Sequence, residues 1–100
     1  MPQQKITAYL LSLSHRDGQS KARFFMRFGF VPAQWEILAT ALRQHARDHE
    51  VQQVEPSPFG TRYVVAGPLV APDGRGPLVR VVWFIETGET IPRLVTAYPA

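Results

Sequence analysis

The sequence predicts a single α+β domain over residues 1–100, with two N-terminal helices packed on a C-terminal antiparallel sheet of three to four strands. Three observations predict this class. A chain of 100 residues is long enough for one hydrophobic core and too short for two. Apolar residues recur every three or four positions before His49, whereas β-branched and aromatic residues dominate from Val51 onward. Short links with glycine and proline then separate the β-rich segments, which favours an antiparallel meander.

The first helix is predicted over residues 20–28. Ser20 is a residue type that caps helix N-termini, and Gly29 stands where a helix ending in the left-handed conformation favours glycine. Three aromatic residues form one apolar stripe along this segment, while three cations lie off the stripe toward water. The stripe consists of Phe24, Phe25 and Phe28, and the cations are Lys21, Arg23 and Arg27. The predicted helix is therefore amphipathic and basic.

A second helix is predicted from residue 32 to about residue 49. Proline is favoured in the first turn of a helix, and Pro32 occupies that place. The residues that follow at the spacing of a buried helical face are Trp35, Leu38, Leu42 and His45. The segment before the first helix, residues 5–13, fits either a helical turn or an edge strand.

Four strands are predicted after the helices, over residues 51–55, 61–66, 78–86 and 93–98. The third strand is apolar on both faces, which indicates a central position in the sheet. Arg80 is the exception in this strand. A guanidinium in the middle of a central strand needs a partner or a ligand, so Arg80 is a candidate functional residue.

Composition limits the classes of protein to which the chain can belong. With 45% hydrophobic and 19% charged residues, the composition is that of a globular protein. The absence of cysteine excludes disulfides, thiolate zinc sites and a cysteine nucleophile. The apolar run around Leu10 is too short to span a bilayer, and no signal peptide is apparent. We expect a cytoplasmic protein without a metal or another cofactor.

The positive charge is concentrated in the first half of the chain. Residues 1–47 hold seven Lys and Arg against two acids and carry +5, whereas residues 48–100 hold four Arg against six acids and carry −2. Arg16, Lys21, Arg23 and Arg27 crowd one segment, where they would attract phosphates. The alternative is an ordinary solvated helix face.

Two histidine patterns are candidates for chemistry. His45 and His49 stand four apart on the second predicted helix, as zinc ligands can, but Ala46 replaces the glutamate of catalytic zinc motifs. We therefore expect a histidine-rich helix end there. His15 lies among cations in a turn-like segment and would suit a general acid or base, although a loop histidine can equally be structural.

The last predicted strand combines hydroxyl groups with one cation. Leu94, Thr96 and Tyr98 are expected to share a face. If the hairpin register places them on the face of Arg80, then an arginine, a threonine and a tyrosine converge on a patch that could hold a phosphate. The alternative is that the hydroxyls only complete the strand and the core.

The chain resembles an uncharacterised family of small bacterial proteins. The resemblance rests on Ser-Lys-Ala-Arg-Phe-Phe at residues 20–25, Gly-Phe at 29–30, Val-Arg-Val-Val-Trp at 79–83, and Pro-Arg-Leu-Val-Thr-Ala-Tyr-Pro at 92–99. It extends from about His15 to Pro99 and implies no function.

More remotely, the order of two helices and a four-stranded sheet is similar to the superfamily of barnase, EndoU, the colicin tRNases and RelE. This resemblance implies a metal-independent ribonuclease, with a histidine or lysine from the helical part and an arginine and a hydroxyl from the sheet facing the scissile phosphate. His15, Lys21, Arg80 and Thr96 would take these catalytic roles. His15 departs from the pattern because it precedes the first helix.

We therefore expect a metal-independent endoribonuclease, such as the toxin of a toxin–antitoxin pair. Arg23, Arg93 and Tyr98 would add phosphate contacts, and RNA and a cognate antitoxin would be the partners. The alternative is a non-catalytic RNA- or protein-binding module of the antitoxin or adaptor type. Under either hypothesis a homodimer would cover the sheet face that two helices leave open.

Overall fold

The computed structural model describes residues 19–100. Its helices are α2 (Gln19–Arg27) and α3 (Trp35–Asp48), the latter preceded by a 3₁₀ turn, η2 (Pro32–Gln34). Its strands are β1 (Val51–Ser57), β2 (Gly60–Pro68), β3 (Leu78–Glu86) and β4 (Arg93–Pro99). The predicted α+β class and the antiparallel sheet are confirmed. α2 and α3 occupy the two segments in which helices were predicted, whereas residues 5–13, expected as a helical turn or an edge strand, lie outside the described residues.

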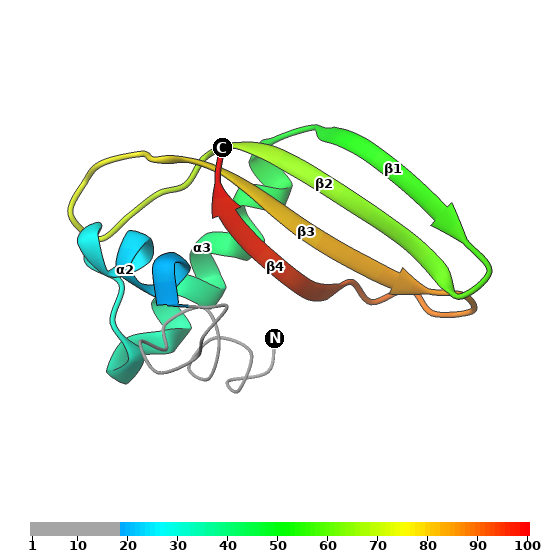
Figure 1. Cartoon of the computed structure of the whole chain (residues 1–100), viewed down its shortest axis with the longest axis horizontal. Helices are drawn as coiled ribbons and strands as arrows, with labels where there is room; N and C mark the ends of the chain where they lie inside the picture. Colours follow the sequence, from blue (N-terminus) through cyan, green and yellow to red (C-terminus); the bar gives the residue numbers. More distant parts are fainter. Residues whose placement is uncertain (1–18) are drawn as a thin grey trace.

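The sheet is a simple meander of order β1-β2-β3-β4, with every neighbouring pair antiparallel (Figure 1). β3 pairs with both β2 and β4, which confirms its predicted central position. β1 and β4 form the two edges, and every residue of β1 is exposed.

A β-bulge in β4 changes which side chains share a face. Thr96 pairs with Val82, but Leu94 pairs with the next residue of β3, Trp83. Val95 is therefore an extra residue, and Leu94 faces the other side of the sheet from Thr96. The prediction that Leu94, Thr96 and Tyr98 share a face is wrong for Leu94, because strict alternation does not survive a bulge.

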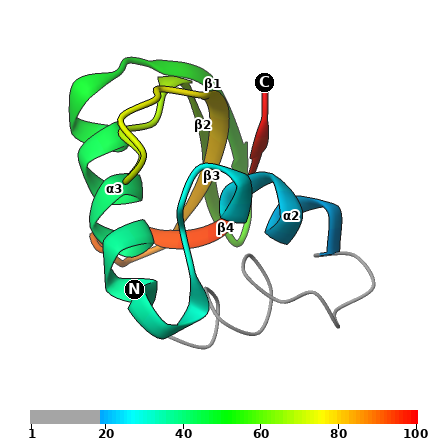
Figure 2. The same cartoon turned by 90° about the vertical axis from the view of Figure 1, so that its left-hand side faces the viewer.

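α3 covers one face of the sheet and α2 lies beside β4 (Figures 1 and 2). The fully buried side chains of Leu38 and Leu42 on α3 pack with Val79 and Val81 of β3 in one core. Burial of each such side chain contributes about 1.5–3 kcal/mol. Trp35, predicted on the buried face, is only half-buried. Within residues 19–100, neither helix has the length and apolarity needed to cross a membrane.

α2 ends in a glycine-dependent turn. The backbone N–H of Gly29 donates to the Met26 carbonyl at 3.1 Å, and that of Phe30 donates to the Phe25 carbonyl at 3.3 Å. This pair of bonds is a Schellman motif, for which Gly29 supplies a φ of +100° as predicted. At its other end α2 begins one residue earlier than predicted, so Ser20 lies inside the helix and does not cap it.

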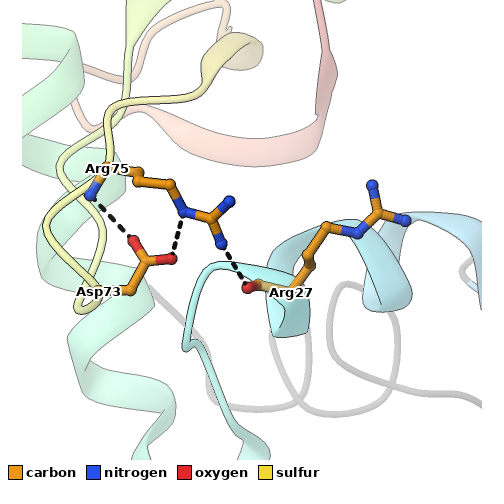
Figure 3. Close-up of polar contacts among 3 residues, drawn as sticks. All are labelled: Arg27, Asp73 and Arg75. Atoms are coloured by element: carbon orange, nitrogen blue, oxygen red, sulfur yellow. Dashed lines mark hydrogen bonds and ion pairs between the residues drawn. The ribbon is translucent and has the colours of Figure 1, made fainter.

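The loop between β2 and β3 is tied to the end of α2 by Arg75 (Figure 3). Its guanidinium donates from Nε to Asp73 at 2.6 Å and from Nη2 to the Arg27 carbonyl at 3.0 Å, and lies 4.4 Å from the Phe28 ring centroid. The backbone N–H and then the guanidinium of Arg75 hold the pKa of Asp73 below its usual value. A turn over residues 71–74 is closed by a hydrogen bond from the Gly74 N–H to the Ala71 carbonyl.

Candidate functional site

The register between β3 and β4 brings three of the predicted site residues onto one face of the sheet. Arg80 lies opposite Tyr98, and Thr96 lies opposite Val82 in the adjacent row. Residues opposite each other in an antiparallel pair have Cβ atoms about 5 Å apart. We call the surface formed by Arg80, Thr96 and Tyr98 the arginine–hydroxyl face. It is the face of the sheet turned away from α3.

The guanidinium of Arg80 has a single weak partner among residues 19–100. Its Nε donates to Oε1 of Gln52 at 3.4 Å. The side chains of Arg80 and Gln52 approach each other over Ala66 of β2, a small residue that lies opposite Arg80. Arg80 is half-buried, so its side chain is not enclosed within the sheet. No carboxylate of the described residues pairs with it, so its positive charge is available to an anion.

Thr96 carries an unused hydrogen-bonding group beside this arginine. Its Oγ1 is shielded from solvent and finds no hydrogen-bond partner within the described residues. Shielded hydroxyls in proteins are nearly always paired, and leaving one unpaired costs about 1–3 kcal/mol. Because Oγ1 is shielded, a ligand next to Arg80 would reach it only if the Thr96 side chain turned toward the surface.

The basic residues of the first helical region lie on or before α2. α2 contacts β4, the strand that carries Thr96 and Tyr98. Lys21, in the first turn of α2, is half-buried and takes part in an interaction within the protein. Arg23 is exposed on the same helix. His15 lies outside the described residues.

Arg93 is separated from the other predicted phosphate-binding residues of the sheet. It pairs with Phe84, four residues along β3 from Arg80, which corresponds to roughly 13 Å. Its side chain is exposed and lies 3.7 Å from Glu86, measured from Nη1 to Oε1. Arg93 therefore lies well away from Arg80 along the sheet and faces a carboxylate of its own strand pair.

His45 of α3 and His49, which directly follows α3, both form hydrogen bonds with the end of β2. Nε2 of His45 donates to the Gly67 carbonyl at 3.0 Å, and Nε2 of His49 donates to the Pro68 carbonyl at 2.9 Å. Burial is the main cause that lowers the pKa of His45. Both imidazoles therefore have structural partners, and no group of three metal-binding side chains occurs in the described part of the chain.

A pocket on the opposite face of the sheet was not predicted. It has a volume of about 620 Å³ and lies between the C-terminal half of α3 and the strands. Arg43 and Arg47 line it from α3, and Tyr63 and Trp83 line it from the sheet. The spacing of the two arginines was a signal in the sequence. Their nearness to the aromatic pair depends on how α3 crosses the sheet, which no local pattern specifies.

Comparison with curated proteins and with solved structures gave no match. A family described as "Domain of unknown function (DUF6883)" matches residues 1–100, the whole chain. This agrees with the predicted membership of an uncharacterised family, and the remote similarity to ribonucleases stays a prediction. The chain belongs to the DUF6883 family.

Proposed function

We propose that the protein is a metal-independent endoribonuclease that holds the scissile phosphate of RNA on the arginine–hydroxyl face. The observation that supports this most is the β3–β4 register, which sets Arg80 opposite Tyr98 and one row from Thr96. Arginine is the side chain best suited to phosphate because its planar fork donates two parallel hydrogen bonds. Within residues 19–100, the guanidinium of Arg80 contacts only the neutral amide oxygen of Gln52.

Such an enzyme cleaves RNA by using the neighbouring 2′-hydroxyl as the nucleophile. A base removes the proton of the 2′-hydroxyl as the new bond to phosphorus forms, and an acid protonates the departing 5′-oxygen as the old bond breaks. The products are a 2′,3′-cyclic phosphate and a 5′-hydroxyl. Cations and hydrogen-bond donors stabilise the extra negative charge of the transition state.

Each predicted residue has a role in this scheme. Arg80 and Lys21 would hold the phosphate, Thr96 would donate from its unpaired Oγ1, and His15 would move protons. Tyr98 would contact the same phosphate from the position opposite Arg80. Arg23 and Arg93 would bind flanking phosphates of the same RNA strand, because both are exposed and Arg93 lies roughly 13 Å from Arg80 along β3.

The charge distribution supports RNA as the substrate. Residues 1–47 carry +5, and α2, the basic helix, contacts the strand that holds Thr96. A small ribonuclease that acts in the cytoplasm must be restrained by its cell. The proposal therefore includes the role of a toxin with a cognate antitoxin.

The second candidate is a non-catalytic RNA- or protein-binding module, either a monomer or a homodimer. The pocket on the face that carries Trp83 favours it, because binding there requires no catalytic group. The two candidates differ in a simple assay. Incubation of the purified protein with RNA in EDTA gives shortened RNA with cyclic phosphate ends for the enzyme, and retarded but intact RNA, or no effect, for the binding module.

A further inference from the structure

The pocket between α3 and the sheet has the size and lining of a binding site. Its volume of about 620 Å³ lies within the range of roughly 300–1,000 Å³ that is usual for ligand pockets. Val65, Ile85 and Leu94 give it an apolar floor together with Tyr63 and Trp83. These residues belong to the face that α3 partly covers, opposite the arginine–hydroxyl face.

Two arginines at the mouth of the pocket carry positive charge that does not contribute to the stability of the fold. Arg43 and Arg47 are exposed, stand one helical turn apart, and make no hydrogen bond or ion pair with other residues of 19–100. Like charges at this spacing destabilise a helix slightly. Asp48, the acid nearest in sequence, accepts a hydrogen bond from Gln44 instead. The pair is therefore free to receive an anionic group.

Trp83 adds a polar group that lacks a partner. Only 8% of its surface is exposed, and its Nε1 makes no hydrogen bond to any part of the chain that the structure describes. An indole N–H is normally paired when it is buried, and an unpaired one costs about 1–3 kcal/mol. Trp83 lines the pocket, but its Nε1 is shielded, so the ring contributes aromatic surface to the lining and not an accessible donor.

We propose that this pocket binds an acidic segment of a partner protein. One large apolar side chain of the segment enters the pocket, and flanking carboxylates meet Arg43 and Arg47. The positively charged mouth favours a ligand with carboxylates, and the apolar floor favours a large apolar side chain. A ligand with both properties therefore fits the pocket best.

A protein segment fits the pocket better than RNA does. A nucleobase needs partners for its polar edges, and the floor of aliphatic and aromatic side chains offers few. A segment also fits better than a small molecule, because apolar surface continues past the pocket. Val54, 54% exposed, lies opposite Tyr63 on the same face, and Ile91, 73% exposed, is at the rim. The pocket lies on the other face from Arg80, Thr96 and Tyr98, and of the proposed nuclease residues it includes Arg93 at its lining.

Selection from a displayed library of random dodecapeptides tests this inference. The full-length protein should enrich peptides that place aspartate or glutamate next to an aromatic or large aliphatic residue. The best peptide, made synthetically, should bind the Arg43→Gln/Arg47→Gln double variant about tenfold more weakly, as expected for two exposed ion pairs. Replacing the apolar residue of the peptide by alanine should abolish binding.

A matched control removes two equally exposed arginines elsewhere. The Arg23→Gln/Arg27→Gln variant should bind the peptide as the wild type does. Selection without enrichment of acidic and apolar residues would overturn the inference, as would equal affinity for both double variants. Tighter binding of a single-stranded RNA dodecamer that depends on Arg43 and Arg47 would also overturn it. Both variants should keep the wild-type unfolding midpoint, because all four side chains are exposed and make no hydrogen bond or ion pair within residues 19–100.

Discussion

Arg80 on β3 lies opposite Tyr98 on β4, and among the described residues its guanidinium meets only the amide oxygen of Gln52, at 3.4 Å. A charged group in a central strand normally has a strong partner. Here no carboxylate of residues 19–100 pairs with it, and the hydroxyl of Thr96 in the next row is also unpaired. Both groups therefore have hydrogen-bonding capacity that the described residues leave largely unused.

Arg80→Gln should have little effect on stability. A half-buried guanidinium with one long hydrogen bond to a neutral group contributes at most about 1 kcal/mol to the free energy of unfolding. Urea unfolding followed by circular dichroism measures this. A loss above about 3 kcal/mol is typical of a broken buried ion pair and would mean that Arg80 has a structural role.

Gly60→Ala should be far more damaging than Gly88→Ala. A Cβ on Gly60 would lie 2.4 Å from the Ile85 carbonyl oxygen, a backbone atom, whereas a Cβ on Gly88 would meet nothing within 4 Å. Both glycines have positive φ, of +158° and +87°. We expect a loss of about 1 kcal/mol for Gly88→Ala from backbone strain and roughly 3 kcal/mol or more for Gly60→Ala. Equal losses in urea unfolding would contradict the β2–β3 packing described above.

Stability should fall as the pH drops below 6.5 because of His45. Its pKa is lowered in the folded protein from the ordinary value of 6.5, mainly by burial and also by His49, with Asp48 acting in the opposite direction. The unfolded chain therefore takes up a proton at higher pH than the folded protein does. The contribution of the neutral ring is complete above pH 6.5 and decreases as the pH falls below it.

The His45→Gln variant isolates this effect. Glutamine can still donate to the Gly67 carbonyl but does not titrate. The variant should lose part of the wild-type decrease in unfolding free energy between pH 7 and pH 5. The same pH dependence in wild type and His45→Gln would show that other groups cause it.

Arg75→Ala should loosen the contact between α2 and the β2–β3 loop. The variant loses the stacking on Phe28 and the hydrogen bond to the Arg27 carbonyl, which together contribute about 1 kcal/mol. Hydrogen exchange should become faster at the amide of Asp73, which donates to the Phe28 carbonyl. Arg75→Lys keeps the charge but not the planar fork, so it should recover only part of the loss. Unchanged exchange in both variants would contradict this role of Arg75.

Most of the fold follows from local patterns. β3 has the bounds predicted from its apolar residues, and α2 ends at the glycine that supplies a positive φ. The bulge at Val95 could not be predicted, because an extra residue in a strand leaves its composition unchanged. That bulge placed Leu94 on the other face from Thr96.

The candidate site was only partly predictable, because strand register and contacts between distant segments leave no local pattern in the sequence. Arg80 was conspicuous as a charge in an apolar strand, but its alignment with Tyr98 depends on the hairpin register, which the sequence between β3 and β4 does not specify. The pocket depends on contacts between distant segments. Arg47 and Trp83 both line it although they are far apart in the chain, and only the path of α3 across the sheet brings them together.

The most direct test of the account is the initial rate of cleavage of a single-stranded RNA in EDTA. The wild-type protein should cleave it and leave 2′,3′-cyclic phosphate ends. Arg80→Gln and Thr96→Val should each slow cleavage about a hundredfold, because each removes a donor to the transition state. The matched control is Arg62→Gln, which removes an exposed arginine of β2 that pairs with Phe84, away from the row of Arg80, and should cleave normally. Intact RNA with the wild-type protein, or equal rates for wild type and Arg80→Gln, would contradict the account.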